Sequence, residues 1–290
     1  MFNLIKMDLY RMFHSVSTWV ILAFTVGIAF FCTVMTNMDL DAIAQDPAYA
    51  VQMEEEIQTE TEGNEDREMG LYTETDPEWV IGKIDAGEFI SSQLVSGLLV
   101  LLCVIFAAVF VNAEQKNGYI KNIAGAIPNR GALALSKLAA LAVQTAVMIA
   151  LFAVSETVLG FILWGERFTV NVTADLLVFF GTQYLLHLGF AALMMFLCIL
   201  TKSSAFGMTA GILMTMGIFV PFYSIINRAV YEIRPSWEFD ISLYMLDGNI
   251  GLAGLGADAD VMVRAAAVGA AFIVLCALFS MLILKRRDVR

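Results

Sequence analysis

The sequence has little of what most enzyme sites need. It contains two histidines and four cysteines in 290 residues, and each cysteine lies in a different apolar run: Cys32, Cys103, Cys198 and Cys276. We interpret these cysteines as small buried residues, and not as a disulfide or metal framework. The sequence also lacks a G-x-x-x-x-G-K-[ST] phosphate loop, an H-E-x-x-H pair and a G-x-S-x-G elbow. These absences argue against nucleotide hydrolysis by this chain, a zinc protease and a serine hydrolase.

Charge is scarce as well. Charged residues make up 16% of the chain, apolar residues make up 59%, and the mean hydropathy is +0.75. A soluble chain of this composition would have too little polar surface. A helix needs about 20 apolar residues to cross a bilayer. Six runs meet that length: 17–36, 89–111, 138–163, 176–200, 206–226 and 261–284. The sequence therefore predicts an all-α integral membrane protein with six transmembrane helices.

The basic residues fall mainly on one side of these six runs. If the N-terminus is cytoplasmic, the inner segments hold Lys6, Arg11, Lys116, Lys121, Arg130, Lys137, Lys202, Lys285, Arg286, Arg287 and Arg290. The outer segments hold Arg67, Lys83, Arg167, Arg228 and Arg234. An excess of Lys and Arg in cytoplasmic loops sets the orientation of membrane helices. We therefore expect both termini to be cytoplasmic.

The N-terminus has two competing interpretations. Lys6 and Arg11 followed by an apolar run are typical of a signal peptide, and 42–44 has a small-residue pattern. The run 19–35 is too long for such a peptide, and the small-residue triplet lies past the membrane edge. We therefore predict an uncleaved first helix. Residues 1–16 have apolar positions at helical spacing, and Lys6, Asp8 and Arg11 lie largely off that apolar stripe, on the polar side. This pattern predicts an interfacial helix or a plain extension of the first crossing.

The segment 37–88 is the one sizeable predicted extracellular insertion. Between Met38 and Glu88 there are 16 acidic residues against two basic ones, which accounts for the net charge of −11. So dense a charge predicts no large independent core. An acidic outer loop could attract cationic substrates, although exclusion of Lys and Arg from the outside would produce the same bias. No basic patch with interleaved aromatic residues exists, so no nucleic-acid partner is expected.

The predicted cytoplasmic loop 112–137 is the most specific segment. It runs from Asn112-Ala113-Glu114-Gln115-Lys116 through Asn117-Gly118-Tyr119-Ile120-Lys121-Asn122-Ile123 to Pro128-Asn129-Arg130 and Ser136-Lys137. The glycines and Pro128 break it into short helical pieces and a turn. This pattern resembles the loop of ABC-2-type exporter permeases that rests on the ATPase subunit. The opening residues 3–11 resemble those of Gram-positive members of that family.

The resemblance implies a function and a set of partners. It implies the membrane-spanning permease subunit of an ATP-driven ABC exporter, with no cofactor bound by this chain and ATP bound by a separate ABC ATPase subunit. A second permease copy or a paralogous permease and the lipid bilayer are the other implied partners. The family's ATPase contacts carry over to residues 1–16 and to loop 112–137. Within that loop we expect the coupling residues Glu114, Gly118, Ile120, Lys121, Ile123, Pro128 and Arg130.

The resemblance also bears on segment 227–260. Family members place short re-entrant helices between the fifth and sixth crossings, and the stretch 239–260 has an apolar middle interrupted by glycines. Broken half-helices are permitted within a bilayer where protein shields the backbone. An ordinary extracellular loop is the alternative.

Few polar residues lie within the predicted membrane helices. Glu156 lies in the third, Gln183 and His187 lie in the fourth, and Arg264 at the start of the sixth is expected to reach for the surface. Counting about 1.5 Å per residue from the helix ends predicts Gln183 as the hydrogen-bond partner of Glu156, with His187 as the alternative. We expect a neutral, hydrogen-bonded Glu156; an ionised group that lines a substrate path is the alternative. Gly207 and Gly211 form a G-x-x-x-G that favours close helix packing and could mark a dimer face.

Two further function classes compete with an exporter subunit. One is a membrane-embedded enzyme, although no catalytic motif for it is present. The other is a proton-coupled secondary transporter built around Glu156, although two inverted halves are not apparent. The sequence does not identify the substrate; a peptide or an antibiotic is the class that the resemblance implies.

Overall fold

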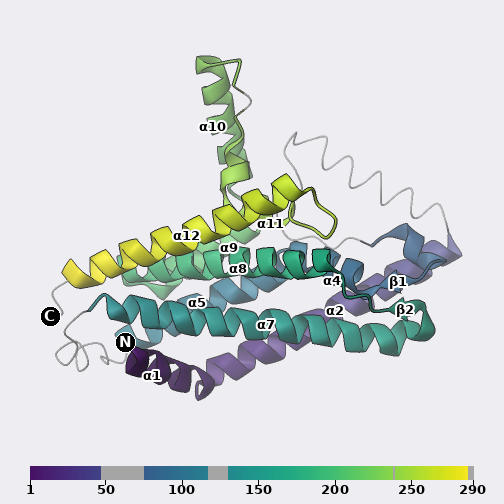
Figure 1. Cartoon of the computed structure of the whole chain (residues 1–290), viewed down its shortest axis with the longest axis horizontal. Coiled ribbons are helices and arrows are strands. Elements are labelled where there is room, and N and C mark those ends of the chain that lie inside the picture. Colours follow the sequence, from purple (N-terminus) through teal and green to yellow (C-terminus); the bar gives the residue numbers. More distant parts are fainter. Residues whose placement is uncertain (47–74, 117–129, 238, 287–290) are drawn as a thin grey trace.

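The computed structural model describes residues 1–46, 75–116, 130–237 and 239–286. Most of these residues are helical (Figure 1). The α-helices are α1 (Phe2–Phe13), α2 (Val16–Gln45), α4 (Ala86–Val95), α5 (Leu98–Lys116), α7 (Ala132–Trp164), α8 (Ala174–Thr201), α9 (Ser204–Thr215), α10 (Val220–Ile233), α11 (Leu246–Ile250) and α12 (Ala259–Arg286). The short elements are the 3-10 helices η1 (Pro77–Val80), η2 (Gly165–Arg167) and η3 (Ile241–Tyr244), and the strands β1 (Ile84–Asp85) and β2 (Phe168–Thr169).

Four helices are long and apolar enough to cross a membrane by themselves, namely α2, α7, α8 and α12. Two bent helix pairs are further candidates: α4 with α5 at 54°, and α9 with α10 at 70°. The protein is thus a helical membrane protein with four candidate spans, or six if each bent pair counts as one. The predicted runs 89–111 and 206–226 are therefore each divided between two helices in the structure.

Both bends occur at residues that interrupt a helix. Gly97 follows α4 and has φ +79°, a conformation that L side chains rarely adopt. The second bend follows Gly217, with φ +71°, and Pro221 lies in the first turn of α10. Proline lacks the backbone N–H and is tolerated at the start of a helix, but not in its interior. These residues end one helix and start the next in a new direction.

Helix α8 lies at the centre of the bundle and contacts α12, α5, α9 and α7. Its contact with α12 is close, because a Cβ at Gly269 would lie 2.8 Å from the backbone carbon of Leu185. The two glycines of the G-x-x-x-G on α9 also serve packing within the chain. A Cβ at Gly207 or Gly211 would collide with side chains of α8 or α5. The G-x-x-x-G face is therefore covered by the chain's own helices, and our suggestion that it marks a dimer face is wrong.

The two ends of the bundle differ. Helix α1, the start of α7 and the C-terminal end of α12 lie at one end (Figure 1). At the other end, β1 pairs in parallel with β2, and Phe89 packs edge-on against Trp79, Trp164 and Phe168. Arg167 of η2 links this end to η1, because its Nη2 donates to the carbonyls of Trp79 and Val80.

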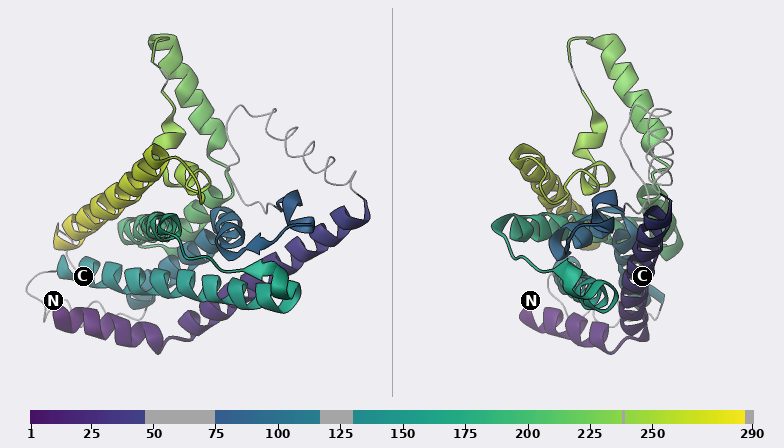
Figure 2. Two further views of the ribbon diagram at one scale, coloured as in Figure 1. Left: turned by 45° about the vertical axis from the view of Figure 1, so that its right-hand side comes forward. Right: turned by 90° about the vertical axis from the view of Figure 1, so that its right-hand side faces the viewer.

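Helix α10 projects away from the bundle (Figures 1 and 2). Apolar side chains on it, such as Phe222 and Ile225, are more than half exposed. Its base is fixed by hydrogen bonds: Asn227 Nδ2 donates to Asp240 Oδ1 at 3.0 Å, and the Tyr223 hydroxyl donates to Asp247 Oδ2 at 2.8 Å. Polar contacts with Asp240, just before η3, and with the buried Asp247 of α11 thus hold α10 in place.

Candidate functional site

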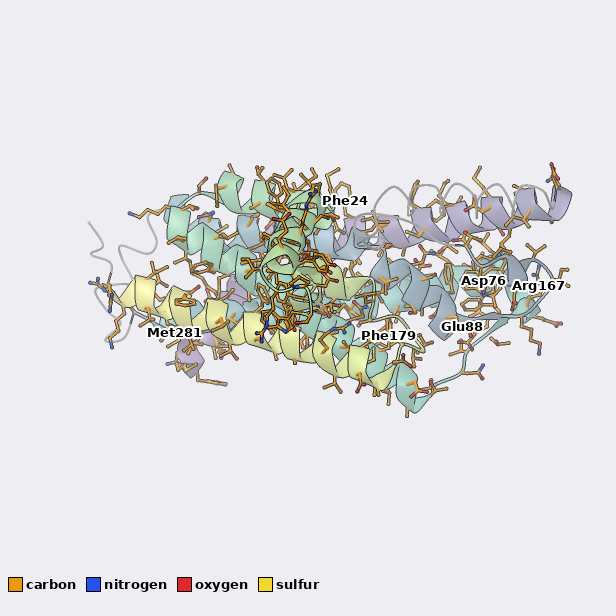
Figure 3. All side chains as sticks on the ribbon, turned by 90° about the horizontal axis from the view of Figure 1, so that it is seen from above. Phe24, Asp76, Glu88, Arg167, Phe179 and Met281 are labelled. Atoms are coloured by element: carbon orange, nitrogen blue, oxygen red, sulfur yellow. The ribbon has the colours of Figure 1, made fainter. Side chains whose placement is uncertain are left out.

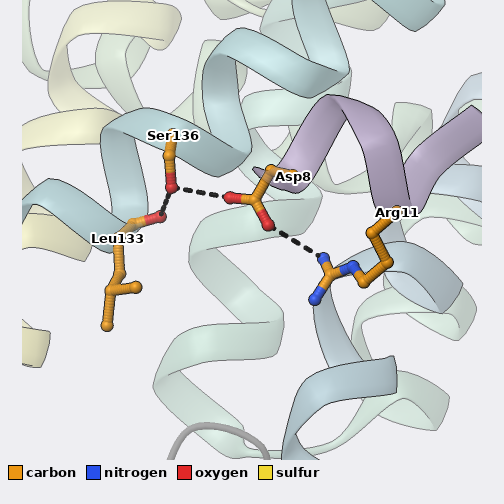
Figure 4. A network of polar contacts seen from close by, with 4 residues as sticks. All are labelled: Asp8, Arg11, Leu133 and Ser136. Carbon is orange, nitrogen blue, oxygen red and sulfur yellow. Dashed lines mark hydrogen bonds and ion pairs between the residues drawn. The ribbon is translucent and has the colours of Figure 1, made fainter. Parts of the chain in front are cut away.

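A buried polar cluster joins α1 to the first turns of α7 (Figure 4). Asp8 on α1 is 1% exposed, and the Ser136 hydroxyl donates to its Oδ2 at 2.6 Å. Arg11 Nη2 lies 3.3 Å from Asp8 Oδ1, which makes an ion pair within α1. A hydrogen bond to an ionised group is stronger than a neutral one. We call Asp8, Arg11 and Ser136 the α1–α7 cluster.

The same cluster also reaches α5. The Arg11 guanidinium carbon lies 4.6 Å from the centre of the Phe110 ring, a cation–π geometry. Phe110 is buried near the C-terminal end of α5. Helix α1 therefore contacts both helices that flank segment 117–129, α5 before it and α7 after it.

The orientation of α1 differs from the expectation for a surface helix. The polar residue Asp8 and the apolar Met12 face the protein, whereas Phe2 and Phe13 are exposed. The sequence pattern had assigned Asp8 to the polar, outward side. An exposed apolar edge next to a polar contact with the bundle is compatible with a helix at a membrane interface.

Two hydrogen bonds cross the bend between α1 and α2. The Thr18 hydroxyl donates to the Met12 carbonyl at 2.5 Å, and Trp19 Nε1 donates to the Phe13 carbonyl at 3.0 Å. Both donors lie in the first turn of α2, and both acceptors lie at the end of α1. These bonds fix the angle at which α1 leaves α2.

Most of the predicted coupling residues lie outside the described residues, namely Gly118, Ile120, Lys121, Ile123 and Pro128. Glu114 lies in the last turn of α5, and Arg130 lies in the turn before α7. The contacts of α1 with these two helices are made by Phe110 of α5 and Ser136 of α7. The role of the residues between them stays a prediction.

Glu156 lies in α7 and is fully buried, but its neighbour differs from our expectation. Its Oε2 lies 2.6 Å from the hydroxyl of Thr33 on α2. Gln183 points elsewhere, because its Nε2 donates to the carbonyls of Ile250 and Ala253 at 3.1 and 3.0 Å. The predicted Glu156–Gln183 pair is wrong. Counting residues along two helices estimated their depth but could not give their rotation.

Gln183 and His187 instead belong to the environment of α11. His187 Nδ1 lies 2.7 Å from the Gln183 carbonyl within α8, and the ring is fully buried. A Cβ at Gly189 would lie 2.8 Å from Leu246, the first residue of α11. Helix α11 therefore packs beside the middle of α8, where Gln183 binds the carbonyl of the last residue of α11 and that of Ala253.

Arg264 also bonds to the protein. Its Nε donates to Asn249 Oδ1 at 3.4 Å, and Asn249 Nδ2 donates to the carbonyls of Leu243 and Met245 at 2.8 Å. Asn249 is fully buried. Arg264 thus links α12 to the segment around α11, a role that the expectation of a surface anchor did not include.

A polar cavity of about 430 Å³ lies at the end of the bundle that carries η1. Asp76, Glu78 and Glu88 line it together with Trp79 and Ser91. Asp76, Glu88 and Arg167 lie at this end, opposite Met281 (Figure 3). Among the described residues, no group of three or more His, Cys, Asp or Glu side chains is arranged to hold a metal ion.

A sequence match identifies the family of the chain. A sequence profile described as "Protein of unknown function (DUF2705)" matches residues 80–290, which is most of the chain. The chain belongs to this family. The match begins in η1 and covers everything from α4 to α12, so α1 and α2 lie outside it. No curated protein matches the chain.

Several polar residues of these sites were not identified from the sequence. Asp8 and Ser136 meet across 128 positions, and Gln93 on α4 is fully buried although it falls in an apolar run. A glutamine or an aspartate within a buried helix face is a signal for an interhelical contact. The sequence does not give the partner, because that depends on which helices become neighbours.

Proposed function

We propose that this chain is the membrane-spanning permease subunit of an ATP-driven exporter in a bacterial plasma membrane. It would work with a separate ABC ATPase subunit and with a second copy or a paralogous permease. One observation carries the proposal: α1 contacts both helices that flank segment 117–129. A permease without a nucleotide site must receive force from its ATPase, and the resemblance in loop 112–137 assigns that contact to this end of the bundle.

The geometry of the α1–α7 cluster suits such a role. The Asp8–Ser136 hydrogen bond fastens α1 to α7, and Arg11 packs on α5. A partner that moves segment 117–129 would therefore act on α1, α5 and α7 together. Isolated surface contacts would not couple three helices in this way.

The position of α11 supports the same proposal. It packs beside the middle of α8, and Gln183 donates to the carbonyls of Ile250, its last residue, and of Ala253 just after it. Irregular backbone at such a depth is tolerated where protein satisfies its polar groups. We therefore propose that segment 239–260 is re-entrant from the outer side, as in the permeases that the chain resembles.

The test is copurification with an ATPase. The tagged chain is expressed in its native host, extracted in mild detergent and analysed for a copurifying ABC ATPase and for ATP hydrolysis. We expect a complex with wild type, less complex with Asp8→Ala, and a normal complex with Glu232→Gln, which alters an exposed ion pair on α10. Failure of a folded wild-type chain to bind an ABC ATPase would contradict the proposal.

Burial of Glu156 favours a second candidate, a proton-coupled secondary transporter. The two candidates differ in their energy source. Glu156→Gln keeps the shape of the side chain and removes its ability to ionise. An exporter subunit with a neutral Glu156 should transport normally with this variant and with ATP alone. Transport driven by a proton gradient without ATP, and lost in Glu156→Gln, would support the secondary transporter instead.

A further inference from the structure

Glu156 on α7 contacts Thr33 on α2. At this contact the Thr33 hydroxyl faces two hydrogen-bond acceptors. The Thr33 hydroxyl lies 2.6 Å from Glu156 Oε2 and 2.8 Å from the carbonyl oxygen of Ala29. A threonine hydroxyl has a single proton to donate, and one proton cannot form two full hydrogen bonds at once. Each contact therefore has its own proton only if a second proton is present, and the Ala29 carbonyl has none.

A protonated carboxyl supplies that proton. If Glu156 carries a hydrogen on Oε2, it donates to Thr33 Oγ, and the Thr33 hydroxyl then donates to the Ala29 carbonyl. Both short contacts become hydrogen bonds with one proton each. If Glu156 were ionised, its buried charge would depend on one shared hydroxyl proton. Such a charge is costly unless it is paired.

No cation is found beside Glu156 in the part of the chain that the structure describes. The titratable group that interacts with it there is the thiol of Cys32 on α2, itself an acid. Its second oxygen, Oε1, has no hydrogen-bond partner among the described residues. The surroundings of Glu156 therefore favour a neutral carboxylic acid.

Gln93 on α4 provides a second, independent observation. It is fully buried, and its Nε2 donates to the Thr36 hydroxyl at 3.4 Å, while its Oε1 has no partner among the described residues. Thr33 and Thr36 lie about one turn apart on the same face of α2. Glu156 and Gln93 therefore meet neighbouring positions of one helix face, and each has one acceptor oxygen without a hydrogen-bond partner among the described residues.

We propose that Glu156 is a buried proton-binding site that also holds water. Its proton lies on Oε2 and is donated to Thr33, while one water molecule donates its two protons to Glu156 Oε1 and Gln93 Oε1. A buried water needs two to four polar partners, and this arrangement supplies at least two. The proposal does not depend on the function proposed above, because it concerns contacts of α2, α4 and α7 alone.

Carbodiimide labelling tests the proton. A hydrophobic carbodiimide adds to a protonated carboxyl: a carboxyl oxygen bonds to the central carbon, and the acid proton moves to a carbodiimide nitrogen. In membranes at neutral pH we expect an adduct on the peptide containing Glu156, found by mass spectrometry. Glu156→Gln should lose it. The matched variant Glu166→Gln, which alters an exposed carboxylate, should keep it.

The same assay separates a proton from a monovalent cation. Sodium ions should not slow the labelling relative to choline at equal concentration. Protection by sodium would mean that the oxygens bind a cation, and would overturn the proposal. Absence of any Glu156 adduct, together with an infrared spectrum lacking the acid band described next, would overturn it as well.

Infrared spectroscopy tests the partners. The C=O stretch of a carboxylic acid should be present in wild type and lost in Glu156→Gln. Thr33→Val removes the acceptor for the Glu156 proton, so this band should shift to higher wavenumber. Thr25→Val is the matched control on α2, because the Thr25 hydroxyl bonds to the Ile21 carbonyl of its own helix. An unshifted band in Thr33→Val would contradict the assigned proton position.

Gln93→Leu tests the water. It removes one of the two acceptors, so the water should be lost and the Glu156 C=O band should shift upward. In D2O, the O–D band of a buried water should disappear in the same variant. If Gln93→Leu leaves both bands where wild type has them, the water-binding part of the proposal is wrong.

Discussion

Asp8→Ala should release α1 from the bundle. The change removes the acceptor of the Ser136 hydrogen bond and the partner of Arg11. A hydrogen bond to a charged group contributes about 1.5–3 kcal/mol. The Arg11 pair adds little, about 0–1 kcal/mol, because Arg11 is 27% exposed. We therefore expect the closed position of α1 to lose about 2–3 kcal/mol.

This loss is measurable as a labelling rate. Met12 is fully buried, so a cysteine at this position in a background without the four native cysteines reacts only when α1 detaches. When opening and closing are fast, the rate follows the opening equilibrium. A loss of about 2–3 kcal/mol corresponds to a roughly 30- to 150-fold faster reaction. Ser136→Ala should give an increase in the same direction.

A cysteine at Tyr10 is the control, since this residue is 65% exposed and should react at the same rate with or without Asp8. The double variant Asp8→Ala, Ser136→Ala should react no faster than Asp8→Ala alone, because both changes remove the same hydrogen bond. An unchanged rate at position 12 in Asp8→Ala would show that the α1–α7 cluster does not hold α1 in place.

Three other predictions concern orientation, coupling and packing. Impermeant thiol reagents should label a cysteine at the exposed position Glu166 in intact cells and leave one at Lys6 unlabelled; reversed labelling would overturn the topology. Arg130→Glu should weaken ATPase copurification while the chain still inserts, and a wild-type complex would contradict the coupling role. Gly269→Ala should cost about 1–3 kcal/mol in a detergent unfolding assay, because its Cβ would overlap Leu185, whereas Gly181→Ala meets nothing within 4 Å and should be neutral.

The sequence predicted which segments are apolar helices but not their interruptions. All six predicted runs overlap helices of the structure. The bends at Gly97 and Gly217 were missed because hydropathy averages over a window and so hides one residue that changes the backbone direction. Glycine and proline inside an apolar run are the local signals of such a bend. Gly217, followed by Pro221 four positions later, is an example.

The polar pairs were harder to predict for a different reason. Glu156 was recognised as a buried acid, but its neighbour Thr33 lies 123 positions away on a helix that the depth count did not consider. A rotation of α7 by one residue would turn Glu156 by about 100° and change its partner. Asp8 was placed on the outward side of α1, although packing against α7 buries it. Helix rotation is set by the packing of the whole bundle.

The contacts of α7 with the α1–α2 unit constrain how force could pass through the protein. Ser136 and Glu156 are 20 positions apart on α7, which is about 30 Å along a helix. The first bonds to α1, and the second contacts Thr33 on α2. Sliding of the α1–α2 unit along α7 would therefore break the Asp8–Ser136 contact and the Thr33–Glu156 contact. The bonds from Thr18 and Trp19 to the last carbonyls of α1 oppose bending at the junction between α1 and α2. A displacement of α1 should therefore move α2 with it as one rigid unit. The movement of α2 would then reach the Glu156 site.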